Sequence, residues 1–165
     1  MNEKFSVMTE GQLRLLEQRR AAFSTYFSEM MPVLADFCRL LELPNPELVV
    51  ADPWLYFTPI ANWIDELEQH ELPSIANRPW LVARLGYLIG ELMANRFRGC
   101  WYVEHRPESR YFARYVVGQF HSFPTACIDP NDCAVQFLDA PNRTPFGQFI
   151  ADIEKELCAL KLVKE

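Results

Sequence analysis

The spacing of hydrophobic positions predicts helices in the first part of the chain. Thr9-Glu10-Gly11-Gln12 has the form of a capping box, so we expect a helix to begin near residue 10. Apolar residues three and four apart continue this pattern through Met30 and on to Leu43. Pro32 interrupts it, and proline both breaks a helix interior and favours a first helical turn. Residues 10–43 therefore form either one kinked helix or two.

Proline marks the starts of the next elements. Residues 44–58 read as a proline-rich connection with short helical turns. Thr58-Pro59 predicts the start of a helix that reaches about His70.

The strongest helical pattern starts at Asn77-Arg78-Pro79 and ends near Gly99. Gly86 and Gly90 lie four residues apart within it, on a face next to the leucine stripe. This spacing predicts that another helix or the sheet approaches closely there. Glu91 lies in the same apolar run, and we expect a nearby arginine to neutralise it.

After Gly99 the hydrophobic period changes from 3.6 to 2, which predicts a β-hairpin over about 100–117. The simplest loop is 107–109, and a loop of odd length pairs odd-numbered residues with odd and even with even. Charged side chains should face solvent, which places Trp101 and Val103 on the buried face.

A third short strand is expected over about 125–128, before Asp129-Pro130 starts a helix that ends near Asp139. Thr144-Pro145 starts the last helix. No repeat or linker divides the chain. The pattern predicts one globular domain over 1–165, of class α+β, mainly helical, with a small antiparallel sheet packed against the helices.

Composition narrows the class of protein further. Half of the 165 residues are hydrophobic, which is enough to build a core, and 16 basic against 22 acidic residues give a net charge of −6. This balance argues against binding duplex nucleic acid. The N-terminus lacks the features of a secretory signal, the longest apolar stretch is too short and charged to span a bilayer, and five scattered cysteines suit a reducing compartment. We expect a cytoplasmic protein with no membrane contact.

Charge is distributed unevenly along the sequence. Residues 42–71 hold seven acids and neither Lys nor Arg, whereas residues 78–114 hold seven Arg and three acids. These stretches either form two patches that attract charged partners or pack together and neutralise each other. Charge runs are usually solvated or internally paired, which favours the second interpretation.

Catalytic and cofactor motifs are missing. The sequence holds no zinc-ligand spacing and no glycine-rich phosphate loop, so neither a metal nor a cofactor is expected. A thiol nucleophile built from Cys100 or Cys127 with His105 or His121 would make the chain a small hydrolase or transferase. A third interpretation is a regulator with a closed apolar cavity for a small ligand, lined by Trp63, Tyr87 and Trp101.

The segment Leu85-Gly86-x-x-x-Gly90-Glu91, followed by Gly99-Cys100-Trp101 and a hairpin, resembles a pattern in small uncharacterised bacterial α+β proteins. In these proteins a helix with the pattern LGxxxGE leads into a strand with the pattern GxW, over about residues 80–130 of the present chain. Some of them look like immunity or accessory proteins. The resemblance implies that the chain binds a partner and transfers no catalytic residue.

The sequence thus favours a non-enzymatic protein that acts as an adaptor or immunity-like protein through protein–protein contact. The partner would be another protein, basic or of mixed charge, and the oligomeric state is left open. Exposed aromatic residues interleaved with arginine are typical of binding surfaces, which points to one face of the hairpin. The predicted binding residues are Tyr102, Glu104, Arg106, Phe112 and Arg114, with the acidic stretch 42–71 as a second candidate.

Overall fold

The computed structural model describes residues 7–67, 77–140 and 142–162. In these ranges, helices surround a three-stranded antiparallel sheet with strand order β1-β2-β3. The predicted α+β class, mainly helical with a small sheet, is confirmed. The predicted helix end near His70 lies outside the described residues.

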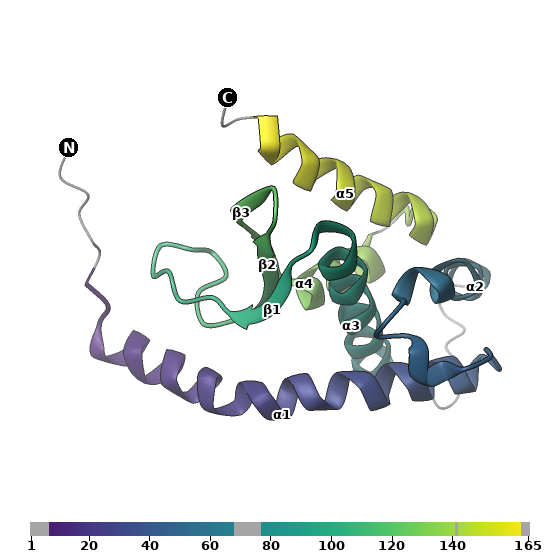
Figure 1. Cartoon of the computed structure of the whole chain (residues 1–165), viewed down its shortest axis with the longest axis horizontal. Helices are drawn as coiled ribbons and strands as arrows, with labels where there is room; N and C mark the ends of the chain where they lie inside the picture. The colour runs from purple at the N-terminus through teal and green to yellow at the C-terminus, as the bar shows by residue number, and fades with distance from the viewer. Residues whose placement is uncertain (1–6, 68–76, 141, 163–165) are drawn as a thin grey trace.

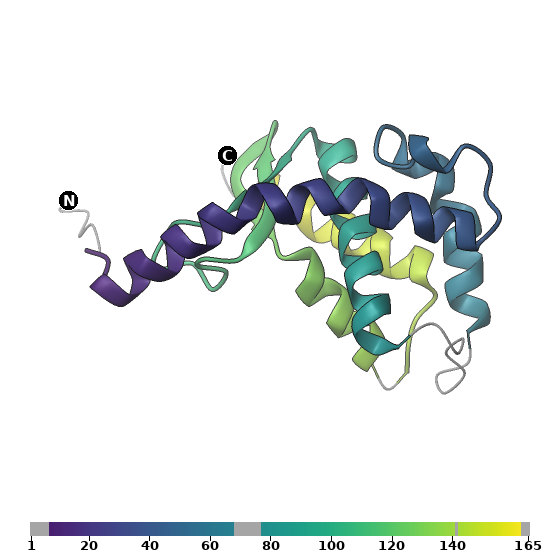
Figure 2. The same cartoon turned by 90° about the horizontal axis from the view of Figure 1, so that it is seen from below.

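Helix α1 (Glu10–Leu40) is one continuous helix that passes through Pro32 and runs along the whole length of the molecule (Figures 1 and 2). The capping box is confirmed, because the Thr9 hydroxyl accepts from the Gln12 N–H and the Gln12 side chain accepts from the Thr9 N–H. From Met30 onward α1 buries one face in the core, through Met30, Leu34, Ala35, Phe37 and Cys38, whereas Leu16 is the one buried residue before Met30. Packing of this face holds the helix on both sides of the proline.

The connection after α1 contains the 3₁₀ helix η1 (Pro46–Leu48), and α2 (Pro53–Glu66) follows. Helix α2 begins at Asp52-Pro53, so the start predicted at Thr58-Pro59 is wrong. Tyr56 lies in its first turns, is buried, and donates its hydroxyl to the Pro44 carbonyl over 2.9 Å. This contact holds the first turns of α2 against the preceding connection, and the helix continues through Pro59.

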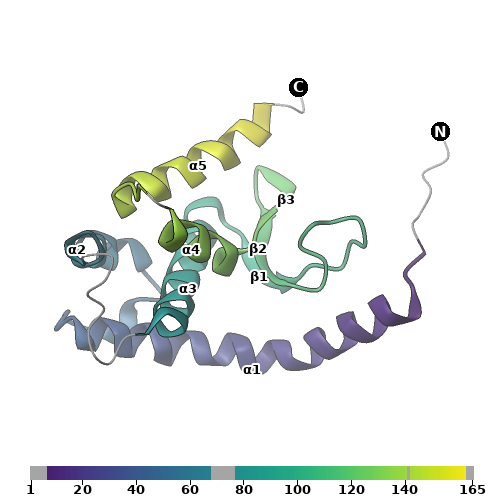
Figure 3. The same cartoon turned by 180° about the vertical axis from the view of Figure 1, so that it is seen from behind.

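Helix α3 (Arg78–Phe97) lies at the centre of the fold, as Figure 1 shows. Asn77 caps its start by accepting from the Trp80 N–H, and every residue from Leu85 to Met93 is buried. On the far side of α3 from α1 lie α4 (Pro130–Asp139) and α5 (Phe146–Leu162), visible in Figure 3. The buried stripe of α5 joins α2 and the sheet to this core.

The sheet consists of β1 (Cys100–Val103), β2 (Tyr115–Phe120) and β3 (Phe123–Ile128). Trp101 pairs with Val117 and Tyr102 with Val116, so the predicted odd-with-odd, even-with-even register is confirmed. The predicted three-residue loop is wrong, because residues 104–114 form one long connection of turns between β1 and β2. Its length is odd, as the register requires.

Both glycines of α3 permit close approach, as their spacing predicts. A Cβ on Gly90 would lie 1.9 Å from the Trp101 ring, and a Cβ on Gly86 would lie 2.2 Å from the Asn131 side chain. The Trp101 Nε1–H then donates to Glu91 Oε1 over 2.7 Å. The prediction that an arginine neutralises Glu91 is therefore wrong, because the indole N–H of Trp101 is its hydrogen-bond partner. Burial raises the pKa of the Glu91 carboxyl.

We expect Gly90→Ala to reduce the free energy of unfolding by about 2 kcal/mol, because the new methyl group displaces Trp101 from α3 and from Glu91. Urea unfolding measures the change. Gly11→Ala is the matched control: nothing lies within 4 Å of its Cβ, so the better helix former should raise stability slightly. A Gly90→Ala protein as stable as the wild type would contradict the close contact.

Candidate functional site

The predicted binding face of the hairpin does not form as a flat exposed surface. Glu104 was expected to face solvent, but its side chain is 0% exposed, which makes this prediction wrong. Arg106 and Arg114 keep 38% and 52% of their side chains exposed, and Phe112 and Tyr102 are half-buried. The prediction assumed that side chains alternate between the two faces along the whole hairpin. This alternation holds only within β1, because the chain leaves the extended conformation after Val103.

Glu104 instead organises a hydrogen-bonded cluster beneath the loop. Its Oε1 accepts from the backbone N–H groups of His105 and Arg106, at 2.9 and 3.0 Å. The Arg106 guanidinium binds both carboxylate oxygens, at 3.0 and 2.6 Å, and also donates to the Thr125 carbonyl on β3. The Cys127 thiol donates to Glu104 Oε2 over 3.3 Å. Arg106 is thus occupied within the protein and ties the loop to the sheet.

These contacts decide the protonation of Glu104. Burial by itself would raise the pKa of this carboxyl, but the hydrogen bonds from Arg106, the backbone and Cys127 outweigh it and lower the pKa to about 2. The carboxylate stays charged at neutral pH and has a structural role.

A second ion pair holds the other end of the loop. Arg114 donates to Asp129 over 3.1 Å, and Asp129 also caps α4. The next residue, Tyr115, stacks on Tyr26 of α1 with ring centroids 4.1 Å apart. Both ends of the 104–114 loop are therefore anchored, and three of its predicted binding residues, Glu104, Arg106 and Arg114, make ion pairs inside the protein.

The acidic stretch behaves differently from the arginine-rich one. Among the described residues, Arg78, Arg96, Arg106 and Arg114 pair with acids that lie outside 42–71. Asp65 caps α5 by accepting from the Phe146 N–H over 2.8 Å. The other acids of the described part of this stretch are exposed and make neither an ion pair nor a side-chain hydrogen bond: Glu42, Glu47, Asp52 and Glu66. The prediction that stretches 42–71 and 78–114 neutralise each other is therefore wrong for the described residues.

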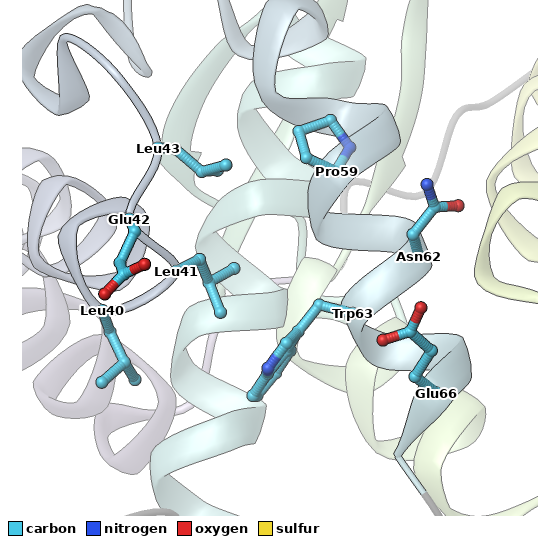
Figure 4. A pocket seen from close by; sticks show the side chains of 8 residues that line it. All are labelled: Leu40, Leu41, Glu42, Leu43, Pro59, Asn62, Trp63 and Glu66. Atoms are coloured by element: carbon cyan, nitrogen blue, oxygen red, sulfur yellow. The ribbon is translucent and has the colours of Figure 1, made fainter.

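Two of these free acids border a groove of about 480 Å³ between the end of α1 and α2. Figure 4 shows Glu42 and Glu66 on opposite sides of an apolar floor. The groove is lined by Leu40, Leu41, Glu42, Leu43, Pro59, Asn62, Trp63 and Glu66. Its walls come from elements buried in the same core, with the Trp63 ring edge-on to Phe37 at 5.6 Å. The groove therefore rests on a fixed base. Sequence reasoning singled out the acidic stretch, but it assigned the leucines that line the groove to the apolar stripe of a helix, which does not distinguish groove residues from core residues.

Glu42 occupies a position that favours glycine. It lies just after α1 with φ of 56°, in the left-handed region. The Glu42 N–H donates to the Arg39 carbonyl and the Leu43 N–H to the Cys38 carbonyl, both at 2.9 Å. This is a Schellman motif, whose left-handed residue is usually glycine. A carboxylate thus stands at the rim of the groove where backbone preference alone would select glycine.

The thiols do not form the nucleophile that the alternative, enzymatic interpretation requires. Cys127 bonds to Glu104, and Cys100 bonds to the side chain of Gln119. Burial raises the pKa of Cys127 to about 11 and also raises the pKa of Cys100, so both stay protonated near neutral pH. Within the described ranges no hydrogen bond joins a cysteine to a histidine.

The residues predicted to line one closed cavity lie apart. Trp63 borders the open groove, whereas Tyr87 and Trp101 pack against each other and against Tyr26. A separate cavity of about 220 Å³ lies between β3, α4 and α5 and includes Cys127 and Cys133 in its wall. In the part of the chain that the structure describes, no three His, Cys, Asp or Glu residues are placed to hold a metal ion. No helix there is long and apolar enough to cross a bilayer.

The buried ion pair predicts a pH dependence. Because the pKa of Glu104 falls from 4.5 unfolded to about 2 folded, its stabilisation is complete above about pH 4.5 and is lost as the pH falls towards 2. We expect Glu104→Gln to cost about 2 kcal/mol at pH 7 and progressively less below pH 4.5, measured by urea unfolding. Glu108→Gln, at an exposed acid, is the control. A cost that is independent of pH would refute this assignment.

Glu42→Gly should stabilise the protein by about 1 kcal/mol, because glycine adopts the left-handed conformation without steric cost. Thermal unfolding tests this. Glu47→Gly removes an equal charge at a residue of ordinary φ and should give no gain. Equal effects of the two changes would show that charge, and not conformation, sets the difference.

Comparison with protein-family models, curated proteins and solved structures finds no match for this chain. The resemblance to small bacterial proteins of the immunity or accessory kind therefore stays a prediction, and the function is argued from the acid-rimmed groove and its surroundings.

Proposed function

We propose that the protein is non-enzymatic and works by binding a positively charged protein partner through four exposed carboxylates of the 42–66 segment, Glu42, Glu47, Asp52 and Glu66, which together are called the acidic face. One observation carries the proposal: these four exposed carboxylates have no cationic partner among the described residues. Exposed charges that a fold does not neutralise are available to an approaching molecule.

The distribution of ion pairs supports this direction of charge. Four arginines of the 78–114 stretch form ion pairs with carboxylates of α4, of α5, of the 104–114 loop and of Asp129, the residue that caps α4. Part of the positive charge is therefore neutralised internally. The acidic face keeps its negative charge, in a chain whose net charge is −6. A basic partner is the protein that this field attracts.

Binding of this kind fits an adaptor or immunity-like role. Attraction between opposite charges raises the rate of association, by about 10- to 1,000-fold in strongly charged pairs, and the effect weakens as salt screens it. The same face lies beside an apolar groove, which supplies the contact area that charge alone does not.

The test neutralises the face without changing its shape, in the variant Glu42→Gln, Glu47→Gln, Asp52→Asn and Glu66→Gln. Tagged wild-type and variant proteins capture partners from a native lysate, and mass spectrometry quantifies what is retained. We expect partners with high isoelectric points to be retained at least ten-fold less by the variant, and less by the wild type as salt rises.

The control changes the same net charge elsewhere, in the variant Glu17→Gln, Glu29→Gln, Glu108→Gln and Glu156→Gln, which alters four exposed acids on other elements. It should retain partners as the wild type does. Equal loss in both variants would mean that total charge and not this face determines capture. Full retention by the first variant would refute the proposal.

A further inference from the structure

We infer that the groove between α1 and α2 anchors the partner by taking one aliphatic side chain between two cationic ones. This inference rests on the proposed function and specifies the chemistry of the segment that docks. It follows from the arrangement of the groove, in which an apolar floor lies between two carboxylates, Glu42 on one rim and Glu66 on the other.

The floor of the groove determines the central side chain. Leu41, Leu43, Pro59 and Trp63 line it, and none of them presents a charge. Leu41, Leu43 and Trp63 are only partly buried, so an incoming aliphatic side chain removes more of their surface from water. A charged side chain placed on this floor would lose hydration and meet no opposite charge among the four floor residues.

The two rims determine its neighbours. Glu42 stands on the turn after α1 and Glu66 in the last turn of α2, on opposite sides of the floor (Figure 4). Neither carboxylate has an ion-pair partner among the described residues, so each can accept a Lys or Arg. The matching segment presents cation, aliphatic side chain and cation in that order along one face.

Other occupants match the groove less well. Two carboxylates on opposite walls do not make a metal site, and no group of three ligands is present among the described residues. An acidic or phosphorylated segment would be repelled by both rims. A second copy of the chain would have to bring cations to the groove, and most arginines of the 78–114 stretch are engaged with acids of their own chain.

The experiment uses three synthetic peptides with blocked ends. The matching probe is Arg-Ala-Leu-Ala-Arg, whose alternation places both cations and the leucine on one face when extended. Arg-Ala-Ala-Ala-Arg lacks the anchor, and Glu-Ala-Leu-Ala-Glu reverses the charges. Titration into ¹⁵N-labelled full-length protein follows the indole N–H signal of Trp63, assigned with Trp63→Phe. We expect the matching probe to shift this signal and to bind at least ten-fold more tightly than either other peptide.

Two protein variants of equal charge locate the site. Glu42→Gln with Glu66→Gln should weaken the matching probe at least ten-fold, whereas Glu47→Gln with Asp52→Asn, in the same segment but outside the groove lining, should change it less than three-fold. Equal weakening by both pairs, or equal binding of the peptides with and without leucine, would overturn the groove as anchor and leave the proposed function standing.

Three further outcomes are decisive. No shift of the Trp63 signal with the matching probe would also overturn the inference, whatever the lysate capture shows. If the Trp63 signal shifted on raising the protein concentration without peptide, the occupant of the groove would be a second copy of the chain. That result would overturn the inferred partner. If the four-residue variant alone lost lysate capture while the matching peptide did not bind at the groove, the acidic face would stand as the binding surface and the groove as its anchor would be refuted.

Discussion

The contact between Trp101 and α3 constrains most of this fold. Only glycine at position 90 leaves room for the indole, and the neighbouring Glu91 accepts its N–H. Strand β1 follows α3 after two residues, Arg98 and Gly99, and Arg98 adopts the left-handed conformation that turns the chain. The position of Trp101 therefore sets the direction of β1 relative to α3. The same indole lies edge-on to Tyr26, which places α1 along the sheet.

Local signals in the sequence predict the parts of this fold that local chemistry determines. The capping box at Thr9 and the cap at Asn77 each act within a few residues, so their effects can be inferred without knowing the tertiary structure. The glycine pair of α3 predicts a close approach, but only the structure shows that Trp101 and Asn131 make it. The start of α2 could not be chosen this way. Asp52-Pro53 and Thr58-Pro59 give similar signals, and the choice depends on the contact of Tyr56 with a carbonyl twelve residues away.

The burial of Glu104 could not be predicted for a related reason. Charge alternation assumes an extended strand, in which neighbouring side chains face opposite sides. The strand ends at Val103, and the carboxylate then turns inward towards two backbone N–H groups, Arg106 and the distant Cys127. The acidic groove has the same origin, since the sequence shows where acids gather but not that the arginines pair elsewhere. Whether a charge is free depends on tertiary contacts.

The backbone conformation at position 42 favours glycine, but the residue there is Glu42, which stands at the rim of the groove. At helix starts the chain follows its backbone preferences, with capping side chains at Thr9, Asn77 and Asp129, whereas the end of α3 also places a non-glycine residue, Arg98, in the left-handed region. At the end of α1 the hydrogen bonds require a left-handed residue, which glycine would supply without strain. Sequences tend to depart from such rules where a side chain has another task. A carboxylate here contributes nothing to the described ion pairs of the fold, and it stands at the rim where the proposed partner would meet it.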